Sequence, residues 1–209
     1  MSAKCKEINL RLSLKAITSL YSEMDEPLTN RKIANGLENL EQLIKWEMED
    51  NLFLYVPSDR AEYYNAEGGF GADVSAKFPS AKFDIAEAGN CFAVGRFTGC
   101  VFHLMRVLEV GLVALGKVFG VSLAHTNWHP AIEEIEKKIR HMGDGPNKAS
   151  DWKEQQEYYS QAASHFMFLK EAWRNYTAHA RGRYAEDEAE TIFVNVRSFM
   201  QKLSERVTE

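Results

Sequence analysis

The sequence predicts an all-α protein, an antiparallel helical bundle with an N-terminal helical extension. Apolar residues recur at steps of three and four along most of the 209 residues, which is the spacing of amphipathic helices. The 5 prolines fall between these periodic stretches or at their ends. A content of 45% hydrophobic and 26% charged residues is typical of a folded globular protein. A chain of this length can therefore bury a core without disulfides.

Residues 1–80 are expected to form a helical hairpin followed by an irregular linker. The first helix has an apolar face of Leu10, Leu14, Ile17, Tyr21 and Met24. Pro27 then ends it, and Thr29 is a suitable N-cap for the second helix. The apolar face of the second helix consists of Ile33, Leu37, Leu40, Ile44 and Met48. From Pro57 to Pro79 the glycines predict irregular structure, so the bundle itself is assigned to residues 81–209.

The centre of the bundle is predicted to be a long helical region from about Ala81 to Phe119, broken near Gly89 or Gly95. One face carries Phe97, Val101, Leu104, Met105, Leu108, Leu112, Leu115 and Phe119. The other sides carry Phe102, Val107, Val110, Val113 and Val118. A helix that is apolar nearly all round must be covered on several sides. We therefore expect it to lie inside its own bundle or at a dimer interface.

The polar residues of this central helix, His103, Arg106 and Glu109, follow one another at steps of three. Polar groups on such a helix need partners if they are buried. Two interpretations fit the spacing. Arg106 and Glu109 form a simple i, i+3 ion pair, or all three residues hold the side chains of a functional site in place.

Three further helices are expected to complete the bundle. The first carries Ile132, Ile135 and Ile139 and ends before Pro146. The second starts near Asp151 and its apolar seam is formed by Tyr159, Ala162, Phe166, Leu169, Trp173 and Tyr176. The third follows Gly182, and its buried face is formed by Ile192, Phe193, Val196, Phe199, Met200, Leu203 and Val207.

Charge and composition exclude several classes of function. A net charge of -5 disfavours general electrostatic binding of nucleic acid, so any RNA contact must be local. The first 20 residues lack the continuous apolar core of a signal peptide, and no run reaches the ~18 apolar residues of a membrane span. We therefore expect a cytoplasmic protein with no membrane contact.

Cofactor and metal motifs are also absent from the sequence. Cys5, Cys91 and Cys100 are odd in number, and the last two would lie on opposite sides of a helix, so all three are predicted to be buried thiols. No C-x-x-C pair occurs, which disfavours redox and zinc motifs. No GK[ST] phosphate-binding loop is present. His125 and His129 have the spacing of a helical metal pair, but the adjacent proline disfavours a helix there. No metal and no cofactor are expected.

The stretch Trp173–His179, WRNYTAH, places an arginine, an amide and a histidine at the predicted end of a helix. These residue types can cut RNA without a metal. His179 can accept a proton from a 2′-hydroxyl or donate one to the leaving oxygen. Arg174 can hold phosphate oxygens, and Asn175 can orient the imidazole or the phosphate. The nearby Lys170, Arg181 and Arg183 are candidates for binding the RNA backbone.

A purely structural interpretation of this stretch is also open. Arg174 could pair with Glu171, and His179 could cap the helix C-terminus. If the stretch is catalytic, one histidine does not easily serve as both acid and base in a single displacement. A two-fold homodimer would supply the second copy.

Several segments resemble HEPN domains, over about residues 81–207. They are Glu87–Asn90, Leu104–Glu109, Leu169–Asn175 with His179, and Glu188–Glu190 with Ile192 and Phe193. In this family the pattern Arg, polar residue, three residues, His forms a metal-independent RNase site. It falls here on Arg174, Asn175 and His179. Residues 1–80 resemble the extension found on some uncharacterised bacterial members.

The resemblance implies an HEPN-like helical bundle, a homodimer and an RNA substrate, with a role as a toxin or in anti-phage defence. An antitoxin or other regulatory protein would be a further partner. Where toxins paired with a nucleotidyltransferase antitoxin have a tyrosine, two residues after the histidine, this chain has Arg181. The alternative implied by the family is a catalytically silent HEPN module for dimerisation, protein binding or nucleotide binding.

Overall fold

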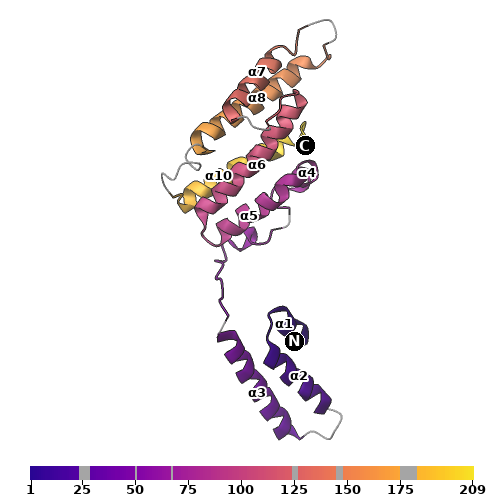
Figure 1. Ribbon diagram of the computed structural model, residues 1–209, viewed down its shortest axis with the longest axis vertical. Helices are drawn as coiled ribbons and strands as arrows, with labels where there is room; N and C mark the ends of the chain where they lie inside the picture. The colour runs from indigo at the N-terminus through magenta and orange to yellow at the C-terminus, as the bar shows by residue number, and fades with distance from the viewer. Residues whose placement is uncertain (24–28, 50, 67, 124–126, 145–147, 175–182) are drawn as a thin grey trace. The chain divides into compact units, whose positions relative to one another are not determined.

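The computed structural model describes residues 1–23, 29–49, 51–66, 68–123, 127–144, 148–174 and 183–209 (Figure 1). Every regular element in these ranges is a helix, which agrees with the predicted all-α class. The chain divides into two compact units, Met1–Leu54 and Tyr55–Glu209.

The first unit consists of α1 (Ser2–Glu7), α2 (Arg11–Glu23) and α3 (Asn30–Glu49). The second predicted apolar stripe lies wholly within α3, whereas in the first Leu10 precedes α2 and Met24 lies outside the described residues. Its buried apolar residues are Cys5, Leu10, Ile17 and Leu40. The Glu47 carboxylate of α3 accepts hydrogen bonds from the backbone N–H groups of Leu12 and Ser13, at 2.7 and 2.8 Å. This carboxylate therefore pairs the free donors at the N-terminus of α2 and sets the register of the hairpin.

The second unit is built around α5 (Lys82–Ala93), α6 (Phe97–Val118) and α10 (Glu186–Leu203). The hairpin of α7 (Trp128–Arg140) and α8 (Trp152–Leu169) completes it (Figure 1). The predicted break in the central region falls at Gly95, whose φ of 72° favours glycine. The core of this unit includes Leu104, Leu108, Leu112, Leu115, Ile132, Ile135, Phe166, Leu169, Val196 and Met200.

The central helix α6 is covered within its own chain on most sides. At Gly111 a Cβ atom would lie 3.0 Å from side-chain atoms of Leu203 and Met200, and 3.3 Å from Phe166. Glycine therefore allows α8 and α10 to approach α6 closely. Phe102 and Val118 remain exposed, and Val110 and Val113 are half-buried.

The bundle is not antiparallel throughout. The backbone N–H of Tyr184, just before α10, donates to Thr98 Oγ1 at the start of α6, at 3.2 Å. At the other end, Leu203 of α10 lies against Gly111 of α6. The two helices therefore run in the same direction. The chain reaches the start of α10 through α8, whose Tyr159 contacts Phe119 and whose Phe166 lies against Gly111, so that α8 runs back toward the end where α6 begins. The predicted antiparallel arrangement holds for α5 and α6 but not for α6 and α10.

The stretch before residue 81 is more ordered than the glycines predicted. It contains η1 (Ala61–Tyr63), α4 (Ala72–Lys77) and η2 (Pro79–Ala81). Its Phe70, Val74 and Phe78 side chains are buried in the core of the second unit. For this reason the boundary between units follows Leu54 and not residue 80.

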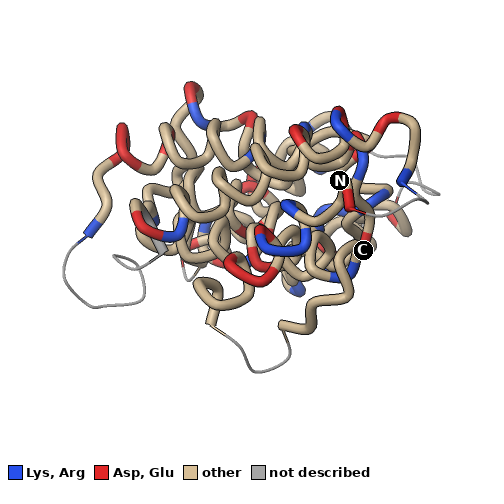
Figure 2. Tube along the Cα trace, turned by 90° about the horizontal axis from the view of Figure 1, so that it is seen from above, with Lys and Arg blue, Asp and Glu red and all other residues tan. Residues whose placement is uncertain are grey.

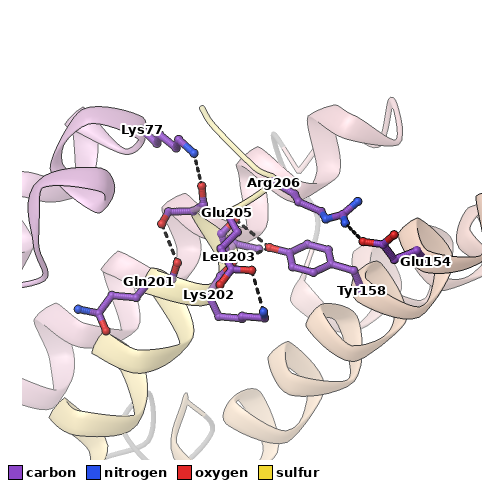
Figure 3. A network of polar contacts seen from close by, with 9 residues as sticks. Lys77, Glu154, Tyr158, Gln201, Lys202, Leu203, Glu205 and Arg206 are labelled. Carbon is purple, nitrogen blue, oxygen red and sulfur yellow. Dashed lines mark hydrogen bonds and ion pairs between the residues drawn. The ribbon is translucent and has the colours of Figure 1, made fainter. Parts of the chain in front are cut away.

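The end of α10 is fixed by side chains from two other helices (Figure 3). The Tyr158 hydroxyl of α8 donates hydrogen bonds to the carbonyl oxygens of Lys202 and Leu203, at 2.7 and 3.0 Å. Lys77 of α4 donates from Nζ to the carbonyl oxygen of Ser204. These bonds add to those that the backbone N–H groups of Glu205 and Val207 donate to the carbonyl oxygens of Lys202 and Leu203. They join α4, α8 and α10 into one unit.

One described helix, α6, is long and apolar enough by composition to cross a membrane. Within the bundle, 61% of the most apolar 18-residue segment of α6 is buried. Its apolar surface is therefore largely accounted for by burial within the bundle.

Candidate functional site

The predicted catalytic stretch follows directly from α8. After Leu169 the helix continues as a π-helix, Lys170–Arg174, and the next described residue is Arg183. Asn175, His179 and Arg181 lie outside the described residues, and so does the side chain of Arg174. π-Helical turns are rare and occur frequently at functional sites. The backbone thus has an unusual geometry where the motif begins, at Trp173 and Arg174.

The two described members of the predicted RNA-binding group differ in their surroundings. The Lys170 side chain is only 12% exposed and pairs with the Glu171 carboxylate. The hydrogen bond from Lys170 lowers the pKa of Glu171. Arg183 is exposed and precedes the buried Tyr184. Of the two, Arg183 is better placed to meet a ligand from solvent.

A polar cluster centred on a buried carboxylate joins α5 to α6. The Asp84 side chain is 6% exposed, and its Oδ1 lies 2.8 Å from His103 Nδ1. The same oxygen accepts a hydrogen bond from Arg106 Nε at 2.7 Å. This bond raises the pKa of Arg106. The structure therefore brings together two of the three residues predicted to support a site.

The third predicted member of this group, Glu109, is exposed and has no hydrogen bond among the described residues. Arg106 pairs with the buried carboxylate of Asp84 instead of forming the simple ion pair with Glu109. The charge of Glu109 still contributes to the raised pKa of Arg106. Sequence reasoning missed Asp84, because an acidic residue in the first turn of a helix is ordinarily explained by the helix dipole. The available signal was a carboxylate in the part of the predicted helical region that precedes the break and the helix carrying His103 and Arg106.

Two exposed aromatic rings flank the imidazole of His103. The ring centroid of Phe83 lies 6.3 Å from that of His103, and the centroid of Phe102 lies 5.9 Å from it. Both contacts are edge to face. Phe83 is 67% exposed and Phe102 is 53% exposed. This surface therefore combines an oriented imidazole, a guanidinium and two apolar rings.

A second histidine lines a shallow cavity of about 220 Å³ between α8 and α10. The His165 ring stacks on Phe199 with centroids 4.7 Å apart and an interplanar angle of 6°. Partial burial lowers the pKa of His165. Gln161, Asn195 and Lys202 supply the polar lining. No carboxylate orients this imidazole within the described chain, unlike that of His103.

The described residues contain no group of three or more metal-ligating side chains. His129 lies in the first turn of α7, with Nε2 at 3.5 Å from Glu133, and His125 lies outside the described residues. Cys5 and Cys100 are buried, whereas Cys91 is partly exposed. Burial raises the pKa of Cys100 to about 12, so its thiol is a poor nucleophile.

Basic and acidic positions are interspersed along the described helices (Figure 2). This distribution accords with the net charge of -5 and leaves local contacts as the means of binding an anionic ligand. Comparison of the chain with protein-family models, curated proteins and solved structures finds no match.

Proposed function

We propose that this protein is a metal-independent endoribonuclease of the HEPN type, in which His179 is the general acid or base. The observation that carries the proposal is the motif Arg174-Asn175-x-x-x-His179, whose arginine is the last residue of the π-helix that follows α8. The all-helical class of the described chain and the exposed Arg183 next to the motif also support it.

The proposed reaction is cleavage by the adjacent 2′-hydroxyl. His179 accepts the 2′-hydroxyl proton while the 2′-oxygen attacks phosphorus and the bond from phosphorus to the 5′-oxygen breaks. Arg174 holds the phosphate oxygens and stabilises the charge that develops on them. Asn175 orients the imidazole or the phosphate by hydrogen bonds. The 5′-oxygen leaves with a proton from a second histidine, and the products are a 2′,3′-cyclic phosphate and a 5′-hydroxyl.

A homodimer would supply that second histidine as His179 of the other copy. In a cell, such an enzyme would act in the cytoplasm as a toxin or in defence against phage, under the control of an antitoxin or regulatory protein. The second candidate is a catalytically silent HEPN module for dimerisation, protein binding or nucleotide binding. The exposed apolar side chains of Phe83, Phe102 and Val118 favour that candidate.

The test is cleavage of a mixed RNA pool in EDTA by wild-type protein and by the double variant Arg174→Ala/His179→Ala. The matched control is His141→Ala, because His141 is exposed and, among the described residues, its ion pair is with Asp144 of its own turn. We expect cutting by the wild type and the control, with cyclic-phosphate ends, and at least a ~10²-fold lower rate for the double variant. Light scattering establishes whether each protein is a dimer.

Equal cutting by the double variant would trace the activity to a contaminant and reject the proposal. Silence of the wild type as a folded dimer, on total RNA from cells as well as on the pool, would favour the silent module.

A further inference from the structure

We propose that α5 and α6 form a binding site for a nucleoside phosphate, built from Asp84, His103 and Arg106 with the rings of Phe83 and Phe102. The ligand is either one unit of single-stranded RNA or a free nucleotide. The RNA form rests on the proposed function. The site itself does not, because none of these residues belongs to the motif at residues 174–179.

The buried carboxylate fixes the geometry of this site. Asp84 Oδ1 contacts one nitrogen of His103 and one of Arg106, at 2.8 and 2.7 Å. With its side chain only 6% exposed, Asp84 is poorly hydrated, so both contacts are strengthened by the low local dielectric. His103 and Arg106 are also three residues apart on α6, on one side of the helix. Their outer atoms are therefore presented to solvent in a fixed arrangement.

The remaining nitrogens suit a phosphate. Because His103 uses Nδ1 to contact Asp84, its Nε2 is the nitrogen left for a ligand, and the side chain is 21% exposed. Arg106 uses Nε, and its two Nη groups have no hydrogen bond among the described residues. The Arg106 side chain is 53% exposed. A guanidinium of this kind can bind two phosphate oxygens at once.

The two phenyl rings suit a nucleobase. Phe83 and Phe102 lie on either helix of the pair and contact the same imidazole edge to face. A structural link between α5 and α6 needs only Asp84 and its two partners, and it gives no reason to expose two large rings beside them. Exposed aromatic rings next to a cation are the usual means of binding single-stranded nucleic acid, because each base has an apolar face to stack.

The experiment measures binding separately from cleavage. Fluorescence anisotropy is recorded with a labelled single-stranded RNA of about 12 nucleotides in EDTA. All proteins are full-length and carry His179→Ala, so the proposed nuclease cannot cut the probe. Into this background we introduce Phe83→Ala/Phe102→Ala, Phe83→Tyr/Phe102→Tyr and Arg106→Gln. The control is Arg140→Gln, which removes one charge from an exposed arginine at the end of α7.

We expect the alanine pair to weaken binding at least tenfold, and the tyrosine pair to bind within about threefold of its parent, because it keeps both rings. Arg106→Gln should weaken binding about tenfold and reduce the dependence of affinity on salt, whereas Arg140→Gln should change it less than about twofold. Displacement of the RNA by adenosine monophosphate would assign the site to a free nucleotide. Retention of the RNA would assign it to the strand.

Equal affinity of the alanine pair and its parent, with unchanged thermal melts, would overturn the proposal. A second result would also overturn the proposal. If neither RNA nor adenosine monophosphate binds and the alanine pair abolishes self-association, the face is a protein interface. A wild-type protein that cleaves RNA as fast after loss of both rings would also reject this site as its RNA-binding surface. That outcome would leave the ribonuclease proposal intact.

Discussion

Asp84 has the most consequential environment of any single described residue, because it is a nearly buried carboxylate that contacts two basic side chains. Asp84→Asn keeps the size and one acceptor but removes the charge. Hydrogen bonds to charged groups contribute about 1.5–3 kcal/mol each, so we expect the variant to lose about that much free energy of unfolding. Urea unfolding followed by circular dichroism measures it.

The matched control for this change is Asp59→Asn, at an exposed aspartate before η1. It should stay within about 0.5 kcal/mol of the wild type. If Asp84→Asn unfolds at the same urea concentration as this control, the contacts of Asp84 contribute nothing to stability.

For single residues, the sequence predicted the hydrogen-bond donors of the α5–α6 cluster better than their carboxylate acceptor. His103 and Arg106 stand out because they interrupt an apolar helix, and that contrast is visible in the sequence. Asp84 lies in a first helical turn, where acidic residues are common, so only its burial in the folded chain distinguishes it. The predicted catalytic residues Arg174, Asn175 and His179 remain predictions, since their side chains lie outside the described residues.

Among the helices, the position of α5 is set by a close backbone contact at Gly89. A Cβ atom there would lie 2.6 Å from the carbonyl oxygen of Tyr63, and backbone cannot rotate away as a side chain can. Gly89→Ala gains about 1 kcal/mol of helix propensity but must displace η1 or α5. We expect a net loss of about 1–3 kcal/mol, measured by urea unfolding.

Gly99→Ala tests whether this loss comes from the contact and not from the substitution itself. The nearest atom to its Cβ would be the Cys91 Sγ at 3.2 Å, the end of a short side chain that can turn. Its stability should change by less than about 1 kcal/mol. A Gly89→Ala protein as stable as the wild type would show that the backbone at Tyr63 can move away without a loss of free energy of unfolding.

Apolar spacing located the helices of the bundle but not their directions. Apolar periodicity shows which face of a helix is buried. It does not show whether α10 begins beside the first or the last residues of α6. The order of residues 55–80 was missed for a related reason. Three buried residues at steps of four, Phe70, Val74 and Phe78, are a short signal among glycines that favour a loop.

For the whole molecule, the all-round apolarity of α6 is mostly explained within one chain, by α5, α8 and α10. Apart from Phe102 in the proposed nucleotide site, the apolar residues of α6 that stay partly or largely exposed include Val110, Val113 and Val118. They are candidates for the expected dimer interface, and the homodimer remains a prediction. The predicted second copy of His179 makes that prediction relevant to catalysis as well as to packing.

The two units differ greatly in the amount of apolar surface that they bury, and this predicts that they differ in stability. The described part of residues 1–54 buries four apolar side chains, whereas residues 55–209 contain the large core built on α6. Chains of about 50 residues with small cores are marginal, because the conformational entropy lost on folding nearly equals the gain from burial. We therefore expect residues 55–209 alone to fold with a single cooperative melt, and residues 1–54 alone to melt at a much lower temperature.

Circular dichroism melts of the two fragments and of the full chain test this prediction. A cooperative transition in the 55–209 fragment, with near-ultraviolet signals from its buried aromatic residues, is the expected result. A 55–209 fragment that is helical but shows no cooperative melt would mean that its core does not suffice by itself. A 1–54 fragment that melts as high as 55–209 would contradict the ranking, because four buried apolar side chains would then supply as much stability per residue as the whole core around α6.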